Sequence, residues 1–186
     1  MAALTDAAMR GDAADYQANL RRRVALLAGV EASLLERVYA EKLQLSPGAQ
    51  HLVAACRAAG LHVLLATSGF DFFALRLQER LGLDSIRCNR LAVADGRLTG
   101  EVSGPDGGAI VDAEDKAQAL RTTCAALGCP TSRSIAIGDG ANDLKMLGLA
   151  GLSVAYRAKP IVQKQAAQAL EFTPLDGVLE WFADAW

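Results

Sequence analysis

The sequence predicts an α/β protein built on a parallel, doubly wound sheet, and three observations support this class. From residue 45 onward, short apolar runs of strand length alternate with longer segments of helical periodicity, which is the pattern of successive strand and helix units. The clearest run, residues 134–137, is closed by Gly138 and leads into a helix start. With 186 residues and a 52% hydrophobic composition, the chain can bury the core that such a sheet requires.

Composition and charge exclude several classes of function. The net charge is −2 with no long run of either sign, so nucleic acid is not an expected partner. No window approaches the length of a membrane span, and Asp6 lies where a signal peptide would be apolar. The four cysteines and two histidines show no paired metal spacing, which argues against zinc and favours reduced thiols. We therefore expect a cytoplasmic protein without a membrane partner.

Residues 1–42 are predicted to form a small helical module. A helix over residues 2–9 is followed by four apolar residues at the spacing of one helix face, namely Tyr16, Leu20, Val24 and Leu27. A third helix over residues 31–40 is expected to turn Leu34, Leu35 and Val38 inward.

The remaining elements are predicted from periodicity and from turn signals. Ser46 followed by Pro47 is typical of a helix start, and Asp95-Gly96 is typical of a hairpin turn. The expected elements are, in order, a helix from Ser46 to Gly60, a buried strand over 61–66, a helix over 71–81, a hairpin over 86–102, a helix from Asp112, a buried strand over 134–137, a helix over 141–149, a strand over 152–155, a short helix from Pro160 and an amphipathic helix over 175–186.

Residues 138–143, Gly-Asp-Gly-Ala-Asn-Asp, form the strongest candidate site. The preceding strand places Asp139 at the carboxyl edge of the sheet, where open α/β sheets bind ligands. Asn142 and Asp143 would then lie on the first turn of the next helix, near its positive dipole end. Two carboxylates and an amide indicate Mg²⁺ and a phosphate, because Mg²⁺ prefers oxygen ligands and substrate phosphates. Helix capping alone would explain one acid but not all three residues.

Two further stretches carry weaker signals for phosphate binding. Thr67-Ser68-Gly69 follows a strand and offers hydroxyls and backbone N–H groups to a phosphate oxygen. The same residues are also ordinary turn formers. Lys116, in the first turns of its helix, fits either a phosphate ligand or a solvated charge.

With these signals in order, the chain resembles phosphoserine phosphatases of the haloacid dehalogenase superfamily. The resemblance covers nearly the whole chain and implies a helical cap over residues 1–42 and a Rossmann-like core over residues 43–186. Five further segments contribute to it: Ala8-Met9-Arg10-Gly11-Asp12, residues 20–26, Leu98-Thr99-Gly100, Ile110-Val111-Asp112-Ala113 and Ala158-Lys159-Pro160.

The resemblance also implies roles for individual residues. Asp139 would ligate Mg²⁺ with Asp143 supporting the site, and Lys116 would neutralise charge on the phosphoryl group beside Asn142. Arg23 would grip the substrate carboxylate, a bidentate task for which arginine is suited. The other substrate-binding residues would be Thr67, Ser68, Gly69 and, on the cap side of the pocket, Met9 and Tyr16.

One part of the family pattern is not found in this sequence. The family opens with an apolar strand ending in Asp-x-Asp-x-Thr or Ser, in which the first Asp is the nucleophile and the second is the general acid. No Asp-x-Asp follows an apolar strand here, and Met1 falls where the cap should already be under way. We therefore expect the usual first central strand, between the strands ending at Thr67 and Asp139, to be missing and the Mg²⁺ site to be weakened. Asp71 adds an acid where the family has threonine.

Three interpretations of function stay open. A phosphatase acting on phosphomonoesters such as phosphoserine would use metal-activated water, helped by Asp139, Asp143 or Asp71, in place of the aspartyl nucleophile. A catalytically inactive domain would still bind phosphate or phosphoserine, and a fragment would take its first strand from another chain. The strands ending at Thr67 and Asp139 are expected to pair directly, or a swapped or intertwined homodimer to cover the gap, since the cap would be tethered only near residues 43–47.

Overall fold

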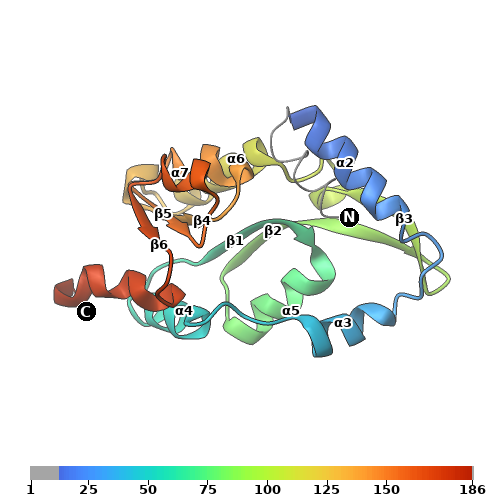
Figure 1. Cartoon of the computed structure of the whole chain (residues 1–186), viewed down its shortest axis with the longest axis horizontal. Helices are drawn as coiled ribbons and strands as arrows, with labels where there is room; N and C mark the ends of the chain where they lie inside the picture. Colours follow the sequence, from blue (N-terminus) through green and yellow to red (C-terminus); the bar gives the residue numbers. More distant parts are fainter. Residues whose placement is uncertain (1–12, 186) are drawn as a thin grey trace.

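The computed structural model describes residues 13–185 and the side chains of residues 16–182, and its framework is two three-stranded sheets (Figure 1). The strand orders are β1-β2-β3 and β4-β5-β6. The strands are β1 (Leu64–Phe70), β2 (Ser85–Ala94), β3 (Arg97–Ser103), β4 (Ile135–Gly138), β5 (Leu152–Tyr156) and β6 (Gln168–Leu170). The α-helices are α2 (Ala13–Ala25), α3 (Leu34–Lys42), α4 (Ala49–Ala58), α5 (Asp71–Leu81), α6 (Ala113–Ala126), α7 (Leu144–Leu147) and α8 (Pro160–Gln163). Short 3-10 helices are η1 (Pro105–Gly107), η2 (Thr131–Arg133), η3 (Ala141–Asp143) and η4 (Leu175–Ala185).

The first sheet joins a parallel pair to an antiparallel hairpin. β1 runs parallel to β2, and β2 runs antiparallel to β3. The hairpin turn has φ angles of 49° at Asp95 and 73° at Gly96, both in the left-handed region that a two-residue hairpin turn requires. The predicted hairpin is therefore confirmed.

The second sheet is parallel throughout, as predicted for the core. β4 pairs with β5 and β5 pairs with β6. Val154 and Ala155 in the central strand are 0% and 1% exposed, as expected of a strand with neighbours on both sides. β6 was not predicted, because three residues are too few to show a strand pattern.

β1 and β4 are the end strands of their sheets, and within residues 13–185 no ladder joins them. The prediction that these two strands pair directly is therefore wrong. Both were also expected to be buried, yet every residue of β1 is only partly buried and Ile135 in β4 is 40% exposed. They still share a core, because Ala66 packs against the apolar cluster that contains Ala136. Each strand lacks a neighbour on one side, and this explains the partial exposure.

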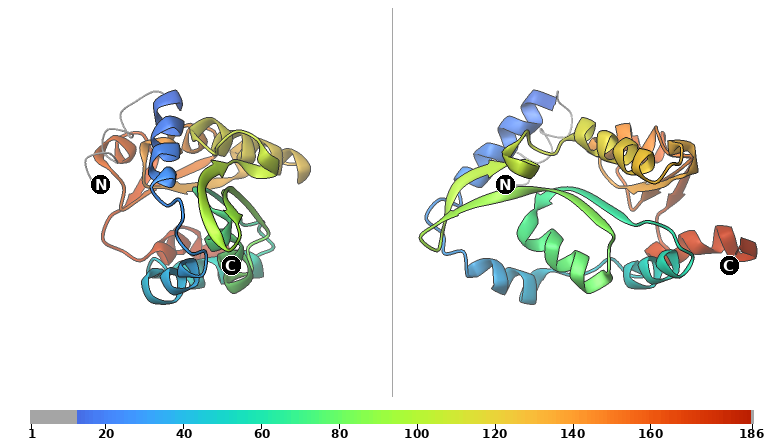
Figure 2. Two further views of the ribbon diagram at one scale, coloured as in Figure 1. Left: turned by 90° about the vertical axis from the view of Figure 1, so that its right-hand side faces the viewer. Right: turned by 180° about the vertical axis from the view of Figure 1, so that it is seen from behind.

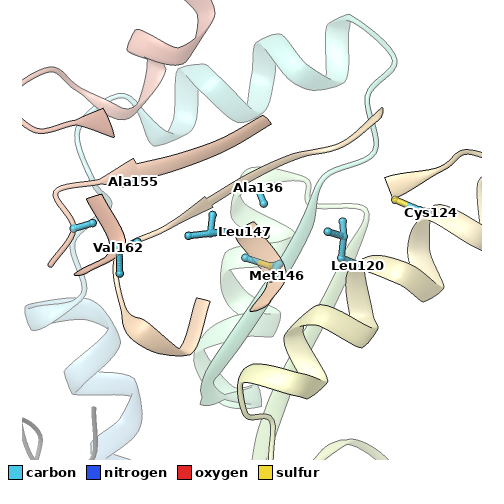
Figure 3. Packing of buried hydrophobic residues seen from close by; sticks show 8 residues of the cluster. Leu120, Cys124, Ala136, Met146, Leu147, Ala155 and Val162 are labelled. Carbon is cyan, nitrogen blue, oxygen red and sulfur yellow. The ribbon is translucent and has the colours of Figure 1, made fainter. Parts of the chain in front are cut away.

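Three apolar clusters hold the elements together. The first lies between α6, α7 and the second sheet (Figure 3). The second joins α2 to the hairpin through Leu20, Val24, Leu91 and Leu98. The third joins α4, β5 and η4.

α2 and the segment that follows it are anchored on the hairpin as well as through the chain. α2 lies alongside β3 in both views of the molecule (Figures 1 and 2). The segment after α2 also extends the hairpin, because Gly29 N donates to Leu98 O and Leu98 N donates to Val30 O, both at 2.8 Å. Gly100 has φ of +86°, and a Cβ there would lie 3.0 Å from the Ala28 Cβ, so this contact requires glycine. The expectation that only residues 43–47 tether the cap is wrong.

Two predicted details of the helices are also wrong. Of the three residues of α3 expected to turn inward, Leu35 packs against the second cluster, but Leu34 and Val38 are 41% and 37% exposed and the helix fully buries none of its residues. α4 begins at Ala49, three residues after the expected Ser46 cap, because the Pro47 carbonyl instead accepts a hydrogen bond from Leu175 N at 2.7 Å. The predicted helix over residues 2–9 lies outside the described residues. No helix in the described part of the chain combines the length and hydropathy that crossing a membrane needs.

Candidate active site

Asp143 is the centre of the loop that follows β4. Its Oδ1 accepts a hydrogen bond from Lys116 Nζ at 2.7 Å, and both side chains are 7% exposed. Its Oδ2 accepts from the backbone N–H groups of Asp139 and Gly140, each at 3.1 Å. This one buried carboxylate therefore fixes the direction of the loop and the position of the lysine ammonium group.

Gly138 is required for this arrangement. A Cβ at residue 138 would lie 2.5 Å from the Asp143 Cβ and 2.8 Å from its Oδ2, so any other side chain would displace the carboxylate. Asp139 follows at the carboxyl end of β4 and is exposed. Its carbonyl accepts from Lys159 N at 3.0 Å. Asn142 is half-buried in η3. The loop thus holds one carboxylate inside and presents the other to solvent.

Lys116 is brought to the loop by α6, whose amino end is capped by Asp112. Asp112 Oδ1 accepts from Glu114 N at 2.9 Å and Asp115 N at 3.1 Å, and Oδ2 accepts from Gln17 Nε2 at 2.9 Å. Burial alone would raise the pKa of Asp112, but these three hydrogen bonds outweigh it and hold the pKa below its usual range. The predicted helix start near Asp112 is confirmed.

Tyr16 and Arg23, two of the three residues expected on the cap side of the substrate, lie on α2. Gln17 of the same helix contacts Asp112 at the start of α6. Tyr16 is half-buried beside Gln17. Arg23 is near the end of α2, and its Nε is buried without a hydrogen-bond partner, so it retains a donor for an anionic group. Met9 lies outside the described residues.

Thr67, Ser68 and Gly69 lie in a bulge at the end of β1. The register between β1 and β2 shifts between Ala66 and Phe70. Thr67 Oγ1 accepts from Gly69 N at 3.0 Å, and Ser68 Oγ is buried without a partner. α6, the helix that carries Lys116, packs against both β1, the strand that contains this bulge, and η3.

Asp71, the acid considered as a replacement base, is engaged elsewhere. Its Oδ1 accepts from Phe72 N at 2.9 Å, and its Oδ2 lies 3.5 Å from Arg90 Nε. Arg90 therefore offsets part of the Asp71 charge.

The residues present fit a magnesium ion that is completed by a phosphate. Within the described chain, no three His, Cys, Asp or Glu side chains gather as a metal cage. Mg²⁺, however, commonly uses one or two carboxylates together with waters and substrate phosphate oxygens. Asp139 provides the exposed carboxylate, whereas Asp143 is already occupied by Lys116 and two backbone N–H groups. Asp143 is therefore suited to supporting such a site rather than to carrying it.

Sequence reasoning missed three features that organise this region. They are Gln17, Asn89 and the role of Asp112 as the hydrogen-bond acceptor for Gln17 of α2. Asn89 is fully buried in β2, but the strand also contains Ser85, Arg87 and Arg90, so one more polar residue there gave no signal. Gln17 carries no signal either, since a glutamine on a surface helix is common.

Comparison with known proteins places this fold and site in a family. A family model for haloacid dehalogenase-like hydrolases matches residues 1–148. The phosphoserine phosphatase of Polaromonas sp. (strain JS666 / ATCC BAA-500) is 51% identical over 180 residues, which cover 97% of this chain and 76% of that protein. The phosphoserine phosphatase of Albidiferax ferrireducens is 48% identical over 182 residues, which cover 98% and 77% of the two proteins.

A solved structure described as a phospho-aspartyl intermediate analogue of phosphoserine phosphatase is similar, with a TM-score of 0.85 and 32% identity over 96% of this chain and 82% of that one. The fold and these similarities therefore define a hydrolase of the α/β class with a Rossmann-like parallel sheet. The chain belongs to the haloacid dehalogenase-like hydrolase family, and the resemblance seen in the sequence is confirmed at that level.

Proposed function

We propose that this chain is a phosphomonoester hydrolase that acts on phosphoserine or a close analogue. The observation that carries the proposal is the buried Lys116–Asp143 pair, 2.7 Å long, held at the carboxyl end of β4 beside the exposed Asp139. A buried ammonium group next to a solvent-facing carboxylate suits the binding of a phosphate and its counter-ion. Phosphoserine is favoured because it is named in the relatives that match almost the whole chain.

Each proposed substrate contact uses a donor that the structure leaves available. Lys116 spends one N–H bond on Asp143, and its other N–H bonds can face phosphate oxygens. Thr67 accepts from Gly69 N, so its hydroxyl proton is free to donate. Arg23 has an unpartnered Nε for the substrate carboxylate. Asn142 adds an amide to the phosphate side. The backbone of Ser68 and Gly69 completes the phosphate side, while Met9 and Tyr16 line the cap side.

Asp139 would hold Mg²⁺ in this proposal, with Asp143 supporting it by fixing the Asp139 backbone. When bound, the ion would neutralise phosphate charge and activate water for attack on phosphorus. We expect weak metal affinity in the absence of phosphate, because of the two carboxylates only that of Asp139 is exposed, and Asp143 already accepts three hydrogen bonds. Asp139, Asp143 and Lys116 are accordingly the proposed catalytic residues.

We further propose that water, rather than an aspartyl side chain, attacks phosphorus. The new P–O bond forms as the bond from phosphorus to the serine oxygen breaks, and a proton from the water is transferred to that oxygen, so that serine and inorganic phosphate are released. The sequence contains no Asp-x-Asp after an apolar strand, and Asp71 is paired with Arg90. Charge stabilisation and binding alone can leave roughly 10³–10⁴-fold catalysis when a nucleophile is removed from a hydrolase. Slow but measurable turnover is therefore the expected behaviour.

The test is phosphate release from phosphoserine with and without Mg²⁺, using the chain as printed. Asp139→Asn and Lys116→Met should abolish Mg²⁺-dependent release, whereas Lys145→Met, at an exposed lysine paired with Glu114, should leave it unchanged. Hydroxylamine trapping distinguishes the attacking group, since it reacts with an aspartyl phosphate. A trapped acyl phosphate would disprove attack by water. Absence of turnover, with phosphoserine still raising the melting temperature, would identify an inactive binding domain instead.

A second candidate is favoured by the outer edges of β1 and β4, which have no ladder partner among residues 13–185. In this alternative the chain needs a strand between them, supplied by another polypeptide or by a swapped or intertwined homodimer. Unpaired strand edges template such additions. Its test is activity against chain concentration, with and without an added apolar peptide ending in Asp-x-Asp, alongside the mass in solution. Activity that is independent of both concentration and peptide would refute it.

The four free cysteines suit a reducing compartment such as the cytoplasm.

A further inference from the structure

The Asn89 side chain in β2 makes hydrogen bonds to two segments that are far apart in the sequence, the bulge of β1 and the residue before the Asp112 cap. Its side chain is 0% exposed. Its Nδ2 donates to Ser68 O at 2.9 Å, and its Oδ1 accepts from Val111 N at 2.8 Å. One buried amide thus connects the bulge of β1 with the segment that leads into α6.

The bulge explains why Ser68 needs this donor. Ala66 pairs with Arg87 and Phe70 pairs with Asn89, so β1 advances four residues while β2 advances two. The intervening residues of β1 leave the regular ladder, as in a β-bulge, where backbone groups lose their usual partners. The Asn89 amide replaces the ladder donor that the Ser68 carbonyl would otherwise have. A buried carbonyl left without any donor would be unfavourable.

The second hydrogen bond fixes the entry into α6. Val111 is 0% exposed and its neighbour Ile110 is 1% exposed, so the segment is buried on both sides. Asp112 follows as the helix cap, and Lys116 N donates to Asp112 O at 3.1 Å, one turn further on. A shift at Val111 would therefore move the lysine ammonium group relative to Asp143.

We propose that Asn89 is a positioning residue for phosphate, setting the distance between the Thr67–Gly69 bulge and the first turns of α6 so that both meet the same anion. The proposal rests on the proposed function for the identity of that anion. Asn89 itself does not touch the phosphate. Its effect passes through the Ser68 carbonyl on one side and the Val111 amide on the other.

The experiment uses three variants of the full chain and two readouts. Asn89→Asp keeps an acceptor for Val111 N but places an oxygen against Ser68 O, whereas Asn89→Leu removes both hydrogen bonds without adding charge. Leu83→Ala is the control, because Leu83 is 8% exposed and precedes the opposite end of β2. The first readout is the Kd for inorganic phosphate, measured by calorimetry. The second is the rate of amide hydrogen exchange at Gly69 and at Val111, compared with the exchange rate of amides that exchange only through global unfolding.

Asn89→Asp should accelerate exchange at Gly69 while Val111 stays protected, and Asn89→Leu should accelerate both. Each should weaken phosphate binding about tenfold, which corresponds to the loss of one well-placed hydrogen bond. Leu83→Ala should lower global stability and leave phosphate affinity unchanged. Exchange and affinity in the Asn89 variants that match those of Leu83→Ala would overturn the proposal. If the Leu variant does not fold, the Asp variant decides. If the unmodified chain binds no phosphate, the proposed function fails, and the positioning role is still decided by the exchange at Gly69 and Val111.

Discussion

Gln17 Nε2 donates a hydrogen bond of 2.9 Å to Asp112 Oδ2 across the boundary between α2 and α6. The other oxygen of the same carboxylate caps α6, the helix that carries Lys116. α2 also carries Arg23, the proposed ligand of the substrate carboxylate. The Asp112 side chain therefore links the position of α2 to the position of Lys116.

Replacing Gln17 with alanine should destabilise the chain by about 0.5–1.5 kcal/mol, the usual net value of one hydrogen bond. Urea unfolding measures this loss. Gln118→Ala is a suitable control, because Gln118 is an exposed residue of α6 and such surface changes usually stay within about 0.5 kcal/mol. Equal losses in the two variants would show that the Gln17–Asp112 contact contributes nothing.

The lowered pKa of Asp112 predicts a particular acid sensitivity. A carboxyl group with a depressed pKa in the folded state adds stability above its unfolded pKa of about 3.9, and this is lost as the pH falls through the folded pKa. Asp112→Asn retains a capping side chain but cannot titrate, so its unfolding free energy should change less with pH below about 4. Asp95→Asn, in the exposed hairpin turn, should follow the unmodified chain. Parallel curves for all three proteins would contradict the prediction.

Lys116→Met should be strongly destabilising, because it leaves the Asp143 carboxylate buried without its counter-charge. Removing one partner of a buried pair typically costs about 3–5 kcal/mol. Lys145→Met removes an exposed ion pair with Glu114 and should cost about 0–1 kcal/mol. Denaturant unfolding of both variants makes the comparison. A small effect at Lys116 would mean that Asp143 is satisfied by the backbone alone.

Gly138→Ala tests whether the loop depends on the close approach of Asp143. The added methyl group would lie 2.5 Å from the Asp143 Cβ, so the carboxylate must move, and overpacking of this kind typically costs about 1–3 kcal/mol. Thermal unfolding and phosphate affinity should both decline. At Gly148, where a Cβ would be 3.3 Å from the Leu144 carbonyl oxygen, alanine should have a much smaller effect. If Gly138→Ala leaves phosphate affinity intact, the loop is less tightly built than its contacts indicate.

Local sequence patterns predicted the elements whose signals are contained in a few neighbouring residues. The helix over 71–81, the Asp95-Gly96 turn and the Asp112 helix start all match the structure. The patterns failed where a distant segment decides the outcome. Leu175 N donates a hydrogen bond to the Pro47 carbonyl, and α4 begins later than predicted. No residue near Pro47 in the sequence predicts this contact.

For the candidate site, the sequence pattern identified Asp139 and Asp143 as residues with the chemistry for phosphate and metal, whereas Lys116 was assigned to phosphate only through the family resemblance. Their residue types and their places after strands or in early helix turns follow from local pattern alone. The structure decided which hydrogen bonds these side chains make. Asp143 accepts from Lys116 and from the loop backbone, and Asp71, the other acid considered, pairs with Arg90.

By itself, the sequence determined the fold class, the hairpin and the residue types of the site, because periodicity and turn chemistry depend on neighbours along the chain. Only the tertiary structure decided that, among residues 13–185, β1 and β4 are end strands with one ladder partner each. It also decided that Asn89 links β1 to the segment before α6 and that Gln17 links α2 to the cap of α6. Those outcomes depend on which backbone groups already have partners and which buried polar groups still need one. Segments far apart in the sequence settle that only when they meet.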